Sequence, residues 1–279
     1  MKKTNKCYFN NRIIPCDKIL INPCDIGILR GYAVFDVMRT QNNKPFLMEQ
    51  HFKRLKNSAS KLNLKVPFNK QEYKKIILNL IKLNRSSAEE LNIRTVLTGG
   101  VSQDAFSISS KPTFFILINK FIPLPKEVYQ KGAKAIIINY KRHIPEAKTT
   151  NYIEAIRNQK IKNKNNALEI IYFENGKVLE ASTSNLFIVK NNKIITPKDS
   201  VLQGITRRLA IKLAKKNFKV EEREILTEEL KNADEVFLTA TNKDIVPIIN
   251  IDGKKINNGN VGDITKFLMN SLEKFLINY

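Results

Sequence analysis

Apolar residues in the first third of the chain follow two different periods. Residues 34–40 (VFDVMRT) predict a strand, in which Phe35, Val37 and Arg39 share one face because side chains alternate along a strand. Residues 50–63 repeat their apolar positions every three or four residues, which predicts an amphipathic helix. Similar patterns predict a short strand over 44–48 after an Asn42-Asn43 turn, a helix over 70–83, and strands over 93–98 and 113–119.

The second half of the chain has shorter apolar segments. Asn175-Gly176 separates two of them and predicts a β-hairpin, because this pair readily adopts the positive φ angles of a two-residue turn. The other strands are predicted over 134–140, 168–174, 177–182, 185–189, 193–196 and 235–239, and the helices over 150–164, 206–217, 227–232 and 263–276.

Two prolines divide these halves. Pro123 and Pro125 fit poorly inside a helix or strand, so we place a domain junction beside them. The resulting prediction is an α+β chain with a smaller domain over residues 1–120, a linker over 121–130 and a larger domain over 131–279.

Composition narrows the class of protein. Of 279 residues, 42% are hydrophobic and 27% are charged, which is typical of a globular chain. The longest apolar runs, such as residues 114–118, are too short for a membrane span. The three cysteines, Cys7, Cys16 and Cys24, are odd in number and lack paired spacing, which argues against a disulfide framework. We therefore expect a reduced, cytoplasmic location. Two histidines leave little for a zinc site, so we expect no metal.

The net charge of +22 is the feature that points to another function. Such a field favours polyanions, so a nucleic-acid-binding protein is a distant alternative. The lysines are scattered along the whole chain, however, and do not form one tail or stripe. We therefore interpret them as solvated surface groups.

Several short motifs occur in a fixed order. They are DIGILRGYAVFD at 25–36, EQHFKRL at 49–55, AKTTNY at 147–152, LEASTSNLF at 179–187, LQGITR at 202–207, ADEVFLT at 233–239 and IVP at 245–247. In this order the series resembles the class IV aminotransferases, the fold-type IV pyridoxal phosphate enzymes, from about residue 22 to about residue 265. The resemblance implies a two-domain fold like that of D-amino-acid aminotransferases, pyridoxal 5'-phosphate as cofactor, and a homodimer.

The chemistry of that cofactor requires particular residues. It needs a lysine for a Schiff base, a carboxylate at the pyridine nitrogen and donors for a phosphate dianion. By resemblance, Lys148 is the Schiff-base lysine and catalytic base, and Glu180, 32 residues later, contacts the ring nitrogen. An arbitrary lysine or strand glutamate would be a solvated surface group, so the motif is what singles out this pair.

The resemblance also implies further cofactor contacts. Tyr152 would hydrogen-bond the phenolic oxygen, although an aromatic core residue is the plain alternative. Arg54 would bind the phosphate; without the resemblance it is a charge on a helix surface, four residues from Ser58. The remaining phosphate donors would come from a helix N-terminus and a later strand end: Ile205, Thr206, Ala240 and Thr241. For Thr206 a simple helix cap is the alternative.

The residues near the substrate differ between the branches of this family. Phe35, Arg39 and Arg94 occupy positions of pocket residues in the branched-chain enzymes, whereas Asn92 and Thr95 depart from that pattern. Tyr152 stands where the lyases usually have arginine, and the loop after residue 98 lacks the Arg-x-His of the D-amino-acid enzymes. We predict a transaminase that exchanges the amino group between an amino acid, of the L-branched-chain type, and 2-oxoglutarate. A D-amino-acid aminotransferase and an aminodeoxychorismate lyase are the alternatives within the fold.

Overall fold

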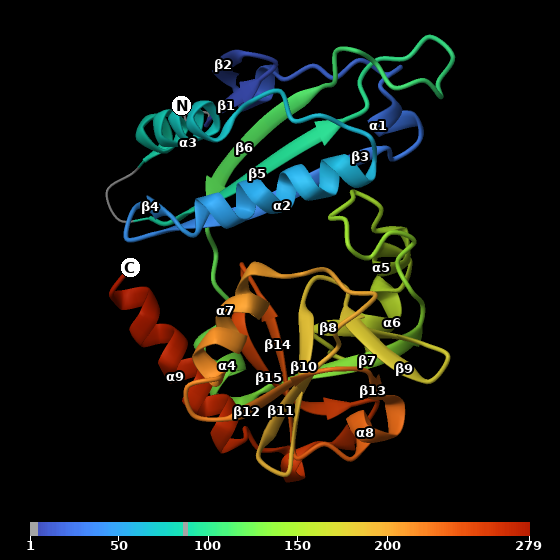
Figure 1. Cartoon of the computed structure of the whole chain (residues 1–279), viewed down its shortest axis with the longest axis vertical. Coiled ribbons are helices and arrows are strands. Elements are labelled where there is room, and N and C mark those ends of the chain that lie inside the picture. Colours follow the sequence, from blue (N-terminus) through green and yellow to red (C-terminus); the bar gives the residue numbers. More distant parts are fainter. Residues whose placement is uncertain (1–4, 86–88) are drawn as a thin grey trace. The chain divides into compact units, whose positions relative to one another are not determined.

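A computed structural model describes residues 5–85 and 89–279. The chain divides into two compact units, the first Met1–Ile122 with Ala147–Asn151, the second Pro123–Glu146 with Tyr152–Tyr279 (Figure 1). The sequence prediction had placed residues 147–151 in the second domain. The structure assigns them to the first because their backbone pairs with a strand there.

The first unit contains an antiparallel sheet in the order β2-β1-β6-β5-β3-β4. Two helices, α2 and α3, pack on one face of it (Figure 1). The elements are β1 Lys6–Phe9, β2 Arg12–Pro15, a 3-10 turn Cys16–Lys18, α1 Ile26–Leu29, β3 Ala33–Gln41, β4 Lys44–Pro45, α2 Met48–Lys61, α3 Lys70–Asn84, β5 Leu91–Thr98 and β6 Phe114–Lys120.

The core of this unit lies between the sheet and the two helices. Phe52 of α2 stacks on Tyr73 of α3 with ring centroids 4.8 Å apart, and Leu55 is fully buried beside them. The predicted strand over 44–48 is wrong beyond Pro45. Leu47 adopts a left-handed conformation (φ 48°) as the N-cap of α2, so the helix begins at Met48.

The structure corrects the expectation for the cysteines. Cys7, buried in β1, forms a disulfide with Cys16, which follows β2 and is nine residues away in the sequence. The β1–β2 hairpin brings them together, with Cα atoms 5.1 Å apart, so the spacing argument missed a pairing made by the turn. Cys24 is a free, exposed thiol. The cytoplasmic location stays a prediction.

The second unit is built on a mixed sheet in the order β12-β11-β10-β14-β15-β7-β8-β9-β13, with β16 beside β15. Its strands are β7 Ala133–Asn139, β8 Glu169–Glu174, β9 Lys177–Ala181, β10 Asn185–Lys190, β11 Lys193–Thr196, β12 Lys219–Glu222, β13 Ile225–Leu226, β14 Glu235–Ala240, β15 Asp244–Ile251 and β16 Lys254–Lys255. Its helices are α4 Lys126–Lys131, α5 Ile153–Arg157, α6 Gln159–Lys164, α7 Ile205–Ala214, α8 Thr227–Lys231, a 3-10 turn Asn257–Gly259 and α9 Asp263–Ile277.

One sequence expectation fails in this unit. The single helix predicted over 150–164 is two short helices, α5 and α6, which meet at Asn158. Helix α4 lies in the predicted linker, with Pro125 as its N-cap, a position outside the helix where proline is tolerated. The core is an aliphatic cluster from strands on both sides of β15, including Leu186, Leu238 and Ile248.

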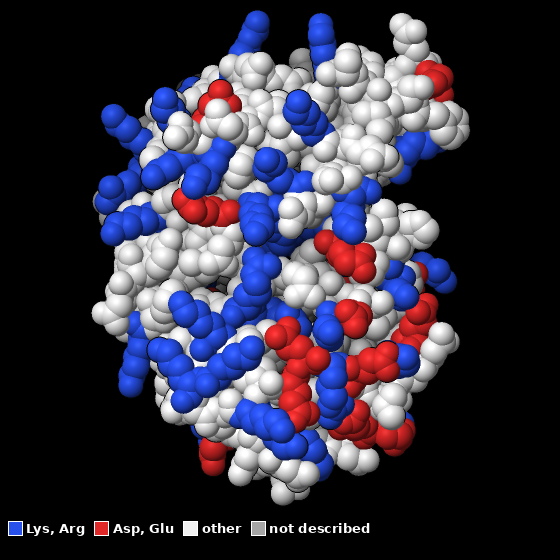
Figure 2. Space-filling view, in the orientation of Figure 1, with Lys and Arg blue, Asp and Glu red and all other residues white. Residues whose placement is uncertain are grey.

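Charged side chains are spread over the surface. Figure 2 shows Lys and Arg over the visible face of both units, with Asp and Glu more numerous over the second. There, Arg223 donates to Glu229 (2.7 Å), and Glu221 lies 3.4 Å from Lys193, Lys219 and Arg223. Part of the basic charge is therefore paired locally. Among the helices of the described residues, none has the length and apolar character needed to cross a bilayer.

Candidate active site

Lys148 is fixed to the first unit through its backbone. The segment around it runs along the open edge of β3: Phe35 donates its N–H to the Lys148 carbonyl (2.9 Å), and Thr150 donates to the Ala33 carbonyl (3.0 Å). The Lys148 N–H donates to Ser58 Oγ of α2 at 3.0 Å. The lysine backbone is thus held from both sides, while its side chain is half-buried.

Lys148 and Arg94 both lie near the ring of Phe35. Lys148 Nζ is 4.7 Å from the centroid of the Phe35 ring, and Arg94 Cζ is 5.6 Å from the same centroid. The strand register explains this arrangement, because Val37 of β3 pairs with Arg94 of β5 and side chains two residues apart share a face. The structure therefore brings the predicted lysine and two of the predicted substrate residues together.

The third predicted substrate residue has a different environment. Arg39 is buried, and its guanidinium lies 4.9 Å from the Phe121 ring centroid and 5.8 Å from that of Phe46. Its positive charge is therefore stacked on aromatic faces.

Arg54 belongs to a buried cluster on the opposite face of β3 from Phe35. Its Nε and Nη2 donate to the two carboxylate oxygens of Asp36, at 2.7 and 3.0 Å. The reading of Arg54 as a surface charge is therefore wrong. The interactions described for Arg54 use these two nitrogens, which leaves the Nη1 protons for a ligand.

Asp36 also contacts His51, whose Nδ1 lies 2.6 Å from Oδ1. Burial alone would raise the pKa of Asp36, but the Arg54 guanidinium and His51 hold it well below its usual range. Burial lowers the pKa of His51, so the ring is neutral and donates through Nδ1. Its Nε2 is buried and has no hydrogen-bond partner among the described residues.

Glu180 lies in β9, after the predicted hairpin, and is 6% exposed. Arg142 Nε donates to its Oε1 at 2.7 Å, and the backbone N–H of Leu202 donates to its Oε2 at 2.9 Å. The reading of an exposed strand glutamate is therefore wrong. Both oxygens are oriented by donors, which favours the ionised carboxylate that a protonated ring nitrogen requires.

The predicted phosphate donors of the second unit lie at the start of α7 and after β14. Gly204 is the N-cap of α7, and no side chain caps the first turn, so the simple-cap reading of Thr206 is wrong. Ile205 and Thr206 are the first two residues of α7, where backbone N–H groups favour an anion. A Cβ on Gly204 would clash with Asn185 Oδ1, so a larger residue there would require that side chain to move.

Thr241 begins the turn between β14 and β15, directly after buried Ala240. Two residues before it, Thr239 Oγ1 is buried without a hydrogen-bond partner among the described residues. The donors present therefore fit a pyridoxal phosphate group: an amine, a guanidinium, an oriented carboxylate and an uncapped helix N-terminus. Tyr152, also predicted to contact the cofactor, is half-buried at the N-cap of α5.

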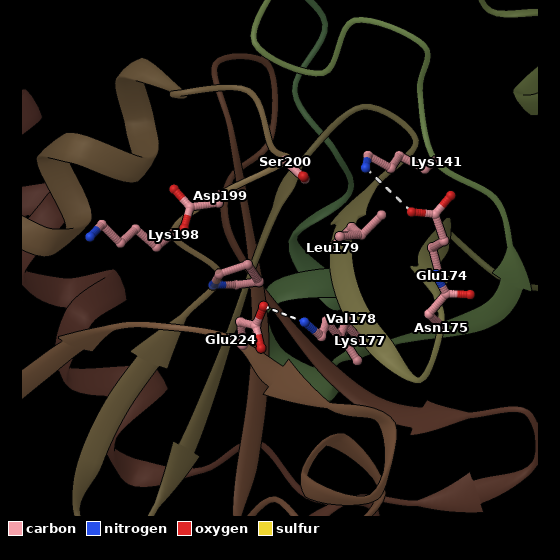
Figure 3. Close-up of a pocket in the computed structure, with 11 residues that line it drawn as sticks. Lys141, Glu174, Asn175, Lys177, Val178, Leu179, Lys198, Asp199, Ser200 and Glu224 are labelled. Atoms are coloured by element: carbon pink, nitrogen blue, oxygen red, sulfur yellow. Dashed lines mark hydrogen bonds and ion pairs between the residues drawn. The ribbon is translucent and has the colours of Figure 1, made fainter.

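A separate cavity of about 220 Å³ lies beside the β8–β9 hairpin (Figure 3). Its rim has two ion pairs, Lys141 to Glu174 at 3.3 Å and Lys177 to Glu224 at 2.6 Å. Leu179 lines it, but none of the predicted cofactor residues does. Within residues 5–85 and 89–279, no cluster of His, Cys, Asp and Glu is arranged for a metal ion.

Sequence reasoning missed three residues that orient the predicted ones. Asp36 holds Arg54, Arg142 holds Glu180, and Leu202 donates its N–H to Glu180. Asp36 ends the first motif and Leu202 begins another, which was a usable signal. Arg142 lies outside all motifs and offered none.

Comparison with known proteins identifies the family. A model described as amino-transferase class IV matches residues 33–251, and the chain belongs to the class IV aminotransferases. It is 34% identical, over 97% of its length and 95% of the relative's, to a Methanocaldococcus jannaschii protein whose name gives branched-chain-amino-acid aminotransferase as a provisional assignment. It is 28% identical to the D-alanine aminotransferase of Bacillus licheniformis, over 98% of this chain and 97% of that protein.

Comparison with solved structures supports the same family assignment. The branched-chain amino acid aminotransferase of Escherichia coli superposes with a TM-score of 0.90 at 25% identity, covering 98% of this chain and 95% of that one. The T.th. enzyme of the same name, solved with pyridoxamine 5'-phosphate, gives 0.87 at 25% identity, covering 97% and 94%. The predicted family, the α+β fold-type IV fold and the pyridoxal phosphate cofactor are thereby confirmed. The protein is an aminotransferase of the branched-chain-like group and acts on an amino acid and a 2-oxo acid.

Proposed function

We propose that this aminotransferase transfers the amino group of L-branched-chain amino acids to 2-oxoglutarate. The supporting observation is the Phe35 ring, with Lys148 Nζ 4.7 Å from its centroid and Arg94 Cζ at 5.6 Å. A substrate that reacts at Lys148 can lay an aliphatic side chain against this ring. A dicarboxylate that reacts there can extend its second carboxylate toward the guanidinium.

The residues have distinct tasks in this proposal. Pyridoxal phosphate supplies, when bound, an aldehyde that reacts with amines and a ring that stabilises negative charge on the adjoining carbon. Lys148 would hold the group through Nζ and, with substrate present, would take the proton from the substrate Cα. Glu180 keeps the proton on the ring nitrogen, oriented by Arg142 and the Leu202 N–H.

The remaining predicted residues bind the cofactor in this proposal. The residues proposed as phosphate donors are Arg54, through its guanidinium, Ile205, Thr206 and Ala240, through their backbone, and Thr241, through its side chain. Tyr152 donates to the phenolic oxygen. Because the amino group resides on the enzyme between two half-reactions, the kinetics are expected to be ping-pong.

A D-amino-acid aminotransferase is the second candidate, because a D-alanine aminotransferase is among the relatives. The loop over residues 99–113 contains Lys111 as its single cationic residue. Part of it folds around Asp104, which accepts from Ser102, Phe106 and Ser107. This loop offers no arginine for a substrate carboxylate, which favours the L-amino-acid proposal.

The test is a substrate panel with purified enzyme. L-leucine, L-isoleucine and L-valine should transfer their amino groups to 2-oxoglutarate. Arg94→Met should raise the KM for 2-oxoglutarate about tenfold or more, the loss of one charged contact, and leave that for 2-oxo-4-methylpentanoate unchanged. The control is Arg12→Met, an exposed arginine of β2 in the same sheet. Turnover of D-alanine alone, or pyruvate release from aminodeoxychorismate without transamination, would overturn the proposal.

We also propose that the enzyme is a homodimer. The short helices α5 and α6 expose three isoleucines, Ile153, Ile156 and Ile161, which are 70%, 69% and 52% accessible. An apolar surface of this kind is typical of a contact between chains. Light scattering on the purified holoenzyme should give twice the chain mass of 32.1 kDa; a monomeric mass would exclude the dimer.

A further inference from the structure

A buried carboxylate in the second unit, which has no role in the proposed chemistry, makes several polar contacts. Glu169, the first residue of β8, is 1% exposed. Its two oxygens accept hydrogen bonds from the hydroxyls of Ser182, Thr183 and Ser184, and its Oε1 also pairs with Lys243 Nζ. One carboxylate therefore binds three consecutive hydroxyls and an ammonium group.

These contacts join three separate segments of the chain. Ser182–Ser184 form the turn between β9 and β10, two residues after Glu180. Lys243 ends the turn between β14 and β15 that begins at Thr241, and its Nζ also donates to Thr183 Oγ1 and to Ser184 Oγ (3.3 Å). Glu169 and Lys243 thus fasten the strand end that presents Glu180 to the turn that presents Thr241.

Stability alone does not explain this arrangement. Removing two charges from water is costly, and an apolar pair of similar volume often stabilises a fold as well or better. Burial would raise the pKa of Glu169, but Lys243 and the hydroxyls lower it to about 2, so the carboxylate stays ionised at working pH. Glu169 and Lys243 form directional hydrogen bonds to two turns at once, which an apolar pair could not do.

We propose that Glu169 and Lys243 are positioning residues that hold the Thr241 turn where it can bind the cofactor phosphate. This inference rests on the assignment of Thr241 as a phosphate donor. The Lys243 backbone is also fixed, since its N–H donates to the Ala240 carbonyl (3.2 Å) and its carbonyl accepts from Tyr129 (3.1 Å). Without the side-chain contact to Glu169, the turn keeps these local bonds but loses its link to the β9–β10 turn.

The test separates phosphate binding from overall stability. Cofactor is removed from purified holoenzyme, and the dissociation constants of pyridoxal phosphate and of pyridoxal, which lacks the phosphate, are measured by visible absorption. Lys243→Met should reduce the preference for pyridoxal phosphate about tenfold, the effect that loss of an outer partner has at metal sites. Lys243→Arg, which keeps the charge, should restore most of it. The control is Lys190→Met, whose lysine pairs with Asp234 at 2.9 Å on the surface of the same unit.

A Lys243→Met enzyme with unchanged preference overturns the positioning role, whatever its melting temperature. Thr241→Val should lower the same preference; if it does not, the assignment of Thr241 fails and the inference with it. Should Lys243→Met not fold, Glu169→Gln/Lys243→Met, which buries no unpaired charge, takes its place with the same expected loss of preference.

Discussion

Replacement of Asp36 by Asn tests the buried cluster around Arg54. The change removes the charge that neutralises a guanidinium which is 9% exposed and bound at 2.7 and 3.0 Å. Breaking a buried ion pair costs roughly 3–5 kcal/mol, because the partner charge stays buried. The asparagine oxygen can still accept from Arg54 Nε, so we expect the lower end, about 3 kcal/mol, or roughly 6–12 °C in the unfolding midpoint.

The measurement is unfolding of the holoenzyme by urea and by heat, followed by circular dichroism. Asp234→Asn is the matched control, since it breaks an exposed pair with Lys190 and should cost less than about 1 kcal/mol. The Asp36 variant should also bind pyridoxal phosphate less tightly than the control does, because Arg54 is no longer oriented by two bonds. Equal losses of stability in the two variants would refute the claim that Asp36 balances a desolvated charge.

Two further predictions concern Lys148 and acid stability. Lys148→Ala should lack the visible absorption of the lysine-bound cofactor, whereas Lys141→Ala, at the rim of the separate cavity, should keep it; absorption retained in Lys148→Ala would refute the lysine assignment. The folded-state pKa values of His51 and Glu169 both lie below their usual values of 6.5 and 4.5, so unfolding takes up protons as the pH falls. The unfolding free energy should therefore decline below about pH 6.5 through His51, and by about 3 kcal/mol more between about pH 5 and pH 2 through Glu169. Glu169→Gln should flatten the second part of a pH titration of stability, and a profile that is level from pH 7 to pH 5 would contradict a neutral, buried His51.

Local patterns predicted the elements that place Glu180. The Asn175-Gly176 turn and its flanking apolar segments indicated strands over 168–174 and 177–182, and β8 and β9 lie at Glu169–Glu174 and Lys177–Ala181. Turn chemistry and side-chain alternation act within a few residues, so a sequence displays them directly. Strand β15 was not predicted; Pro247 lies within it, and proline is rare in central strands.

Contacts between distant segments were not predictable in this way. Arg142 reaches Glu180 across 38 residues, and Lys243 reaches Glu169 across 74. Each depends on which strands become neighbours, and nothing in the local pattern of Arg142 or Lys243 distinguishes it from a solvated surface group. The excess of lysines, which gives the chain its charge of +22, hides the few that have a specific partner.

The pairing of the Lys148 segment with β3 affects whether either unit can be produced as a separate fragment. Because Ala147–Asn151 belong to the first unit while the residues on either side belong to the second, neither unit is one uninterrupted stretch of polypeptide. A fragment that stops at Ile122 would lack the Lys148–Thr150 segment that pairs with β3. The backbone at Ala33–Phe35 would then be an unpaired strand edge, which favours self-association. Grafting residues up to Ile122 onto another enzyme would likewise leave behind Lys148, the proposed Schiff-base lysine.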